Sequence, residues 1–144
     1  MAMTGAAGAE LDFIPAPGKW SLRQILCHLA DSELEAGVRF RRLIAEDNPT
    51  LVGYSQDAWA EKLDYARRKT TQALETFRHL RGVNHDLLLG IPEEAYARQG
   101  THTERGTVSL LDMLRIYTRH PEKHAEQMRA VRQEYKKFRE QTRG

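Results

Sequence analysis

The sequence predicts an all-α protein built from long antiparallel helices, and three observations favour this class. Apolar residues recur at helical spacing over most of the 144-residue chain. The last such stretch, from Leu110 to Phe138, alternates steps of four and three residues, which is typical of helices packed in a bundle. No segment shows the regular alternation of apolar and polar residues that indicates a strand. We therefore expect residues 1–144 to form a single helical domain.

The start of the chain predicts a loop followed by a long helix. Residues 1–19 are rich in Ala, Gly and Pro, and we expect a tail and a loop that leads into the first helix. Ser21 can act as the N-cap of that helix, and Gln24 completes a capping box. The sequence EDNP predicts its end near residue 47.

The middle of the chain predicts one short and one long helix. Residues 56–65, QDAWAEKLDY, are typical of a short helix, and the apolar set from about Arg67 predicts a long one. Gly90 and a following proline predict where the long helix ends. Residues 91–109 contain several helix breakers, so we expect a long linker with one helical turn at 93–97.

The last helix, expected from about residue 107, carries two histidines with a proline between them. His120 and His124 lie on one face at this spacing, close enough to hold one ion. Pro121 removes a helical hydrogen bond and frees the carbonyl of Tyr117, so we expect a kink and another partner for that carbonyl. Because the apolar seam keeps its phase through the proline, one kinked helix is favoured over two.

A histidine pair alone also fits one buried and one exposed imidazole, so a metal site needs a third ligand. His28 is the best candidate, because it lies near the edge of the apolar stripe of the first helix, although a lone histidine there also fits polar packing. Imidazole nitrogens suit Zn²⁺, Ni²⁺, Cu²⁺ or Fe²⁺. Three such ligands leave a coordination position open, as in catalytic sites.

Two carboxylates, Asp31 and Glu35, follow His28 on roughly its side of the helix. Either could act as a base or anchor a ligand, and each also fits a solvated face. Cys27 points about 100° away from His28 around the helix and is interpreted as a small core residue. We expect the remaining histidines on the surface or in an exposed loop, where one could line the mouth of a cleft: His79, His85 and His102.

Composition and charge exclude several classes of protein. The chain is 40% hydrophobic and 29% charged, as expected of a globular protein. A net charge of +2 predicts no strong attraction to nucleic acid or to a membrane surface. No apolar run approaches the roughly 20 residues of a membrane-spanning helix. The single cysteine suits a reducing compartment and the N-terminus lacks a secretory signal, so we expect a cytoplasmic location.

Two segments, PAPGKWSLRQILCHLADSE and THTERGTVSLLDMLRIYTRHPEKHAEQM, resemble the DinB/YfiT-like superfamily of bacterial helical bundles. The match runs from about Pro15 to Met128. It depends jointly on the Trp–Ser start of the first helix, the histidine in that helix and the pattern H-x-x-x-H-x-x-Q at residues 120–127. The resemblance implies a four-helix-bundle type of fold and a site of three histidines: His28, His120 and His124.

The resemblance also implies a divalent metal ion, usually zinc or nickel in this family. Members of known activity include thiol-dependent S-transferases, and others are described as metal-dependent hydrolases. We therefore expect a metal-dependent enzyme that acts on a small molecule, with a low-molecular-weight thiol as a candidate partner.

The chain departs from the family pattern at its N-terminus. Family members usually carry a long helix before the PAPGKW segment, but only 19 residues precede Trp20. We therefore expect the usual N-terminal helix to be shortened or missing, and a homodimer or higher oligomer to cover the exposed seam.

Two alternatives to an enzyme stay open. The first is a non-catalytic oligomeric bundle whose metal site is structural or a relic, which the shortened N-terminus motivates. The second, less favoured, is a nucleic-acid binder, because six basic and only two acidic residues follow from Arg129 onward. Such a basic stretch also suits the C-terminus of a helix.

Overall fold

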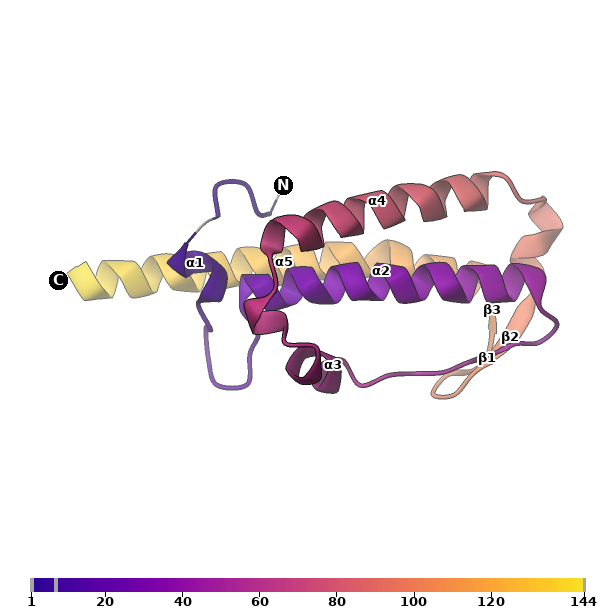
Figure 1. Cartoon of the computed structure of the whole chain (residues 1–144), viewed down its shortest axis with the longest axis horizontal. Helices are drawn as coiled ribbons and strands as arrows, with labels where there is room; N and C mark the ends of the chain where they lie inside the picture. The colour runs from indigo at the N-terminus through magenta and orange to yellow at the C-terminus, as the bar shows by residue number, and fades with distance from the viewer. Residues whose placement is uncertain (1, 7, 144) are drawn as a thin grey trace.

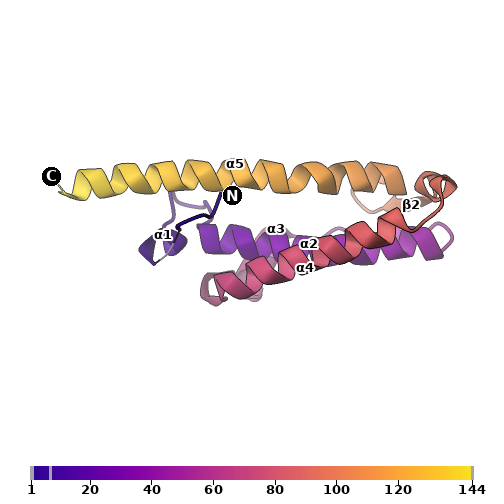
Figure 2. The same ribbon diagram turned by 90° about the horizontal axis from the view of Figure 1, so that it is seen from above.

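Three long helices, α2 (Leu22–Ala45), α4 (Thr70–Leu89) and α5 (Leu110–Arg143), make up most of the computed structural model, which describes residues 2–6 and 8–143. Helices α4 and α5 both pack along α2 (Figure 1). The C-terminal part of α5 extends beyond the other two, toward α1 (Figure 2). Among the described residues no helix is long and apolar enough to cross a membrane. The predicted single domain includes residues 1, 7 and 144, and the predicted tail of residues 1–19 includes residues 1 and 7; these three residues lie outside those described.

Helix α2 begins at the predicted capping box. The Ser21 backbone N–H donates to Gln24 Oε1 at 2.9 Å, and the Gln24 N–H donates to Ser21 Oγ at 3.2 Å. A small residue, Gly37, lies where α4 crosses α2. A Cβ atom at this glycine would lie 2.7 Å from Oδ1 of the buried Asn84 on α4. The two helices therefore approach closely because position 37 has no side chain.

The shorter helical elements follow the sequence prediction in the middle of the chain. Helix α3 (Gln56–Lys62) lies within the predicted short helix of residues 56–65, and η2 (Glu93–Ala97) is the predicted turn in the linker. The 3-10 helix η1 (Tyr65–Arg67) begins at the last residue of the predicted short helix and was not predicted. Within the segment expected as a tail and loop, the structure adds a short helix, α1 (Ala9–Asp12). An ion pair from Arg23 on α2, 2.7 Å to an aspartate of α1, holds this helix in place.

A small three-stranded sheet is present where we expected only a linker, so the prediction that the chain has no strands was wrong here. Strand β2 (Gln99–His102) pairs with β1 (Thr50–Leu51) in parallel and with β3 (Gly106–Ser109) in antiparallel fashion. These strands are too short to show a period of two in the sequence. Gly100 is required at its position, because a Cβ atom there would lie 2.7 Å from the carbonyl oxygen of Pro49.

Helix α5 continues through Pro121, which confirms the prediction of one helix rather than two. The freed carbonyl of Tyr117 accepts a hydrogen bond from Arg81 Nη1 on α4 at 2.9 Å. The same Arg81 nitrogen lies 3.0 Å from Oε2 of the buried Glu33 on α2. One arginine therefore supplies the missing hydrogen bond and ties the three long helices together.

The buried apolar residues form two clusters, one toward each end of α2. One cluster includes Leu22 to Ala30 of α2 and Met128 of α5. The other includes Ala36 to Leu43 of α2 and Leu110 to Tyr117 of α5. Between them lies a polar layer, contributed by residues 31–33 of α2 and by the turns of α5 that follow Tyr117. The histidines of α5 belong to this layer.

Candidate metal centre

Three histidines converge where α5 crosses α2. His28 comes from α2, and His120 and His124 come from consecutive turns of α5. Nε2 of His120 lies 3.1 Å from Nε2 of His28 and 2.9 Å from Nε2 of His124. Each ring offers one nitrogen as a ligand atom, and these three nitrogens lie within 4.8 Å of one another. The structure thus brings together the three residues that the sequence suggested as ligands.

Burial keeps these imidazoles neutral. His28 is only 1% exposed, and burial, followed by the proximity of His124 and His120, lowers its pKa to about 3. Burial also lowers the pKa of His120 to about 4 and lowers the pKa of His124. A neutral imidazole has a free lone pair on one nitrogen, which is the form that binds metal ions.

Hydrogen bonds from neighbouring side chains select which nitrogen keeps that lone pair. Gln127 Oε1 lies 2.7 Å from Nδ1 of His124, and an amide oxygen can only accept, so Nδ1 carries the proton. Ser32 Oγ lies 3.5 Å from Nδ1 of His120, at the limit of a hydrogen bond. Both contacts leave Nε2 facing the other imidazoles, as in metal sites whose ligands are oriented by surrounding groups.

The donor set fits a divalent metal ion. In a tetrahedral site with metal–nitrogen bonds of about 2.0–2.1 Å, ligand nitrogens lie about 3.3 Å apart. The Nε2 pairs here, at 3.1 and 2.9 Å, need to separate by only a few tenths of an ångström. Three neutral imidazoles without a fourth protein ligand would leave one position open to a small molecule.

A cavity of about 130 Å³ lies beside His120, which is part of its wall. Its wall includes Ser32 and Arg39 of α2, Tyr54 from the segment after β1, His102 of β2 and Tyr117 of α5. We expected His102 to be exposed in a loop, which was wrong: it is 4% exposed, because strand pairing turns its side chain inward.

Sequence reasoning missed Ser32, Arg39 and Tyr54. The first two follow His28 by four and eleven residues on the same face of α2, so the heptad spacing could have indicated them. Tyr54 comes from an irregular segment that carries no periodic signal. Burial raises the pKa of its hydroxyl, and the nearby Ser32 hydroxyl acts in the opposite direction. Tyr54, Ser32 and His120 thus share the wall of one cavity.

The two candidate carboxylates are engaged elsewhere. Asp31 accepts a hydrogen bond from the Tyr65 hydroxyl at 2.7 Å. Glu35 Oε1 lies 3.5 Å from Nε of Arg39. For neither carboxylate do the described residues show a hydrogen bond to the three histidines. Asp31 is linked to His28 indirectly: Tyr65, its hydrogen-bond partner, packs against the Trp20 ring, and that ring packs against His28.

The remaining histidines and the cysteine lie as expected. His79 and His85 are exposed on α4, as predicted. Cys27 is 2% exposed in the core, and burial raises the pKa of its thiol to about 11. A thiol of this kind is a poor nucleophile near neutral pH, which supports the interpretation of Cys27 as a core residue.

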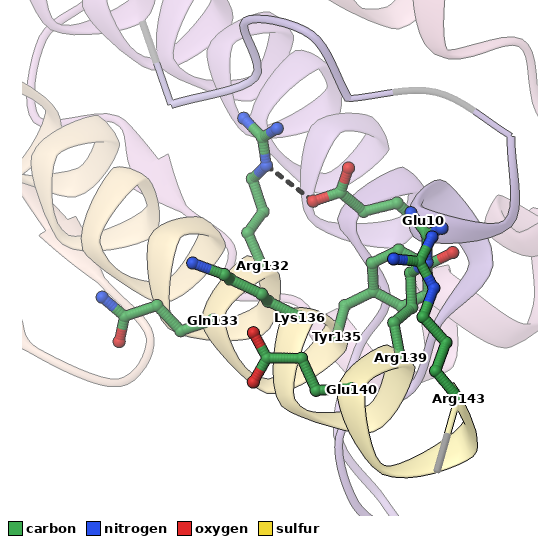
Figure 3. Close-up of a pocket in the computed structure, with 8 residues that line it drawn as sticks. All are labelled: Glu10, Arg132, Gln133, Tyr135, Lys136, Arg139, Glu140 and Arg143. Atoms are coloured by element: carbon green, nitrogen blue, oxygen red, sulfur yellow. Dashed lines mark hydrogen bonds and ion pairs between the residues drawn. The ribbon is translucent and has the colours of Figure 1, made fainter.

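A larger hollow, of about 470 Å³, lies far along α5 and contains none of these histidines. Figure 3 shows that its walls are mostly charged side chains of the last turns of α5, with Gln133 and Tyr135 among them, together with Glu10 of α1. Arg132 Nε lies 2.7 Å from Glu10 Oε1, and its Nη1 donates to the backbone carbonyls of Ala2 and Thr4. These contacts hold the N-terminal segment against α5.

Comparison with known proteins places this geometry in a family. The sequence model of the DinB superfamily matches residues 1–128. A protein of Oceanobacillus iheyensis named "Putative metal-dependent hydrolase" is 32% identical over 116 residues, which cover 80% of this chain and 66% of that protein. The "Putative metal-dependent hydrolase YfiT" of Bacillus subtilis is 27% identical over 117 residues, with coverages of 81% and 66%. The chain thus spans just under two thirds of these relatives.

The solved structure of YfiT from Bacillus subtilis superposes with a TM-score of 0.84 at 25% sequence identity. The match covers 90% of this chain and 75% of that one. YfiT is described there as "a probable metal-dependent hydrolase with an unusual four-helix bundle topology". This likeness confirms the predicted fold class of a four-helix-bundle type.

Proposed function

The chain belongs to the DinB superfamily, and on this premise we propose that His28, His120 and His124 hold a divalent metal ion at the centre of an enzyme active site. The observation that carries the proposal is the convergence of three buried, neutral imidazoles through their Nε2 atoms. The names of the two relatives above, which describe metal-dependent hydrolases, support the same conclusion.

The residues around the centre have different roles in the proposed reaction. An ion held by three imidazoles supplies a Lewis acid with an open position for a water, a thiol or a substrate oxygen. Gln127 and Ser32 orient two of the imidazoles. Trp20 packs against His28 at a ring-centre distance of 5.2 Å and excludes water from that side. The cavity beside His120 holds the substrate.

We propose hydrolysis of a small molecule as the first candidate reaction and thiol S-transfer as the second. The ion is zinc or nickel, since both accept imidazole ligands. Asp31 and Glu35 stay candidates for the base, each after release from its present partner. A cytoplasmic location also belongs to this proposal.

A homodimer completes the proposal. Leu34 and Val38 lie one turn apart on α2 and are 52% and 47% exposed. Apolar side chains grouped in this way on a surface favour association with another chain. Analytical ultracentrifugation is expected to give the mass of a dimer, and a monomer at all accessible concentrations would contradict this part.

The second candidate is a non-catalytic oligomeric bundle with a structural or relic metal site. It is favoured by one observation: both candidate carboxylates are engaged, Asp31 by Tyr65 and Glu35 by Arg39. This candidate predicts metal binding without turnover, so a screen of the metal-loaded protein against esters, amides and thiol–electrophile pairs separates the two.

Metal content tests the centre itself. Purified protein is incubated with Zn²⁺, desalted and assayed for bound metal, with His120→Ala and His124→Ala beside it. We expect about one ion per chain in the wild type and a large loss in both variants. His85→Ala is the matched control, because His85 is exposed on α4. Equal metal content in all four proteins, with folds intact by circular dichroism, would contradict the proposal.

A further inference from the structure

Arg39 brings a buried positive charge to the wall of the cavity beside His120. The residue is 7% exposed. Its Nη1 donates to the Tyr117 hydroxyl at 2.7 Å, and its Nη2 donates to the carbonyl of Val52 at 2.8 Å. These two bonds fix the plane of the guanidinium group without using all five of its N–H donors.

One donor of this arginine has no hydrogen-bond partner. Among the described residues, Arg39 Nε is the one buried side-chain nitrogen or oxygen that makes no hydrogen bond. Glu35 Oε1 lies 3.5 Å away, outside hydrogen-bond geometry, and its side chain is 27% exposed, so water screens its charge. A buried donor that makes no hydrogen bond is costly, and because Arg39 lines the cavity, a ligand there would supply the hydrogen bond that the ion pair with Glu35 does not.

The charges around the cavity also favour an anion. Its wall contains two positive residues, Arg39 and Arg105, and one negative residue, Glu104. His102 adds a neutral ring, because burial lowers its pKa and the two arginines lower it further. Nδ1 of His102 accepts from the Glu104 backbone N–H at 3.1 Å, so its proton is on Nε2, which makes Nε2 a donor.

We propose that this cavity binds a carboxylate group of the substrate, with Arg39 as its anchor, and so selects small anionic molecules for the metal centre. This assignment of a substrate class rests on the proposed function. A guanidinium group matches the geometry of a carboxylate and forms strong charge-assisted bonds with it. A cavity of about 130 Å³ accommodates a carboxylate on a short carbon chain, whose other end faces His120.

The test follows the Nε–H signal of Arg39 by ¹⁵N NMR, assigned through Arg39→Lys. Metal-free and zinc-loaded protein are each titrated with sodium propionate, with neutral propionamide of the same shape, and with inorganic phosphate. We expect propionate to shift the signal in the metal-free protein and propionamide to leave it unchanged. Since the metal-free arm does not depend on the histidine site, loss of zinc binding would defeat the proposed function and leave this result standing.

Variants locate the binding site. Arg39→Gln is expected to weaken propionate binding, measured by calorimetry, at least about tenfold, as for loss of a charge-assisted bond. If Arg39→Gln does not fold, Arg39→Lys replaces it. This variant keeps the positive charge but lacks the planar guanidinium group, and it is also expected to weaken propionate binding. Arg105→Gln is expected to weaken propionate binding by a smaller factor. Arg67→Gln is the control, because Arg67 has an 86% exposed side chain and is not part of the cavity wall.

Four results would overturn the proposal. They are equal shifts with propionate and propionamide, propionate binding only when zinc is present, tighter binding of phosphate than of propionate, and unchanged affinity in Arg39→Lys and Arg105→Gln. Binding only with zinc would mean that the carboxylate coordinates the ion instead of contacting Arg39.

Discussion

At the scale of single residues, Gln127 determines which nitrogen of His124 is available to a metal ion. Its Oε1 atom, 2.7 Å from Nδ1, fixes the proton there and leaves the lone pair on Nε2. Without this contact the ring can rotate and can carry its proton on either nitrogen. The imidazole of His124 would then no longer be held in the orientation that binds the metal ion.

We therefore expect Gln127→Leu, which keeps the bulk and removes the acceptor, to weaken zinc affinity by about 10- to 100-fold. Competition with a chromogenic chelator measures the change. Gln133→Leu serves as the control, because Gln133 is exposed two turns further along α5. An unchanged zinc affinity in Gln127→Leu would show that the contact does not orient the ligand.

At the scale of helices, the effects of Pro121 and Arg81 are linked, although the two residues are 40 positions apart in the sequence. The proline removes the N–H that would bond the carbonyl of Tyr117, and Arg81 Nη1 replaces it from α4 at 2.9 Å. Helix α5 therefore stays continuous at the level of the histidines. The same nitrogen pairs with the buried Glu33, so the replacement also connects α5 to α2.

This pairing predicts coupling between the two positions. Pro121→Ala restores the N–H, so Arg81→Ala is expected to destabilise the Pro121→Ala protein less than the wild type, by about 1 kcal/mol. Urea denaturation of the two single variants and the double variant gives the coupling energy. Arg81→Ala also removes the ion pair with Glu33, but it does so both in the wild type and in Pro121→Ala, so this loss cancels from the coupling energy. Additive effects would contradict the interpretation of Arg81 as the substitute donor.

Two glycines in the long helices have opposite environments. A Cβ atom at Gly37 would lie 2.7 Å from Oδ1 of Asn84, whose amide is held by Glu33 and cannot easily move. A Cβ atom at Gly82 would meet nothing within 4 Å. The first glycine is therefore needed for the contact between α2 and α4, and the second is not.

We expect Gly37→Ala to destabilise the protein by about 1–3 kcal/mol despite its higher helix propensity, since the contact is overpacked. Gly82→Ala, its matched control, should stabilise by about 0.5–1 kcal/mol, because alanine favours the helix. Urea denaturation measures both. A stabilising Gly37→Ala would mean that the two helices can separate at little cost.

At the scale of the whole molecule, the histidines join helices that are far apart in the chain. His120 and His124 lie in the polar layer between the two apolar clusters, and His28 lies on α2 about one turn before that layer. A bound ion would link the two helices at this point. Metal binding and folding are therefore expected to be coupled.

Zinc is accordingly expected to raise the free energy of unfolding. At a free concentration 100 times its dissociation constant, the increase is about 2.7 kcal/mol. Thermal denaturation with and without zinc measures it, and His28→Ala should abolish it, whereas His79→Ala should not. An equal increase in both variants would indicate binding elsewhere.

The sequence by itself determined the long helices and the candidate ligands. Capping boxes, glycine and proline stops and apolar periodicity depend on residues within a few positions of one another, so they can be recognised locally. The pair at His120 and His124 has a helical spacing, and His28 lies on a recognisable apolar stripe. These features also carried the resemblance to the DinB superfamily, which the match over residues 1–128 confirms.

Only the tertiary structure decided the small sheet, the burial of His102, the donor for the Tyr117 carbonyl and the cavity beside His120. Each depends on residues that are distant in the chain, such as β1 and β2, or Arg81 and Tyr117, which meet only after the helices pack. Periodicity indicates which face of an element is buried, but not which residue of another element it meets. That pairing follows from the way the helices pack and from the cost of leaving buried polar groups without hydrogen bonds.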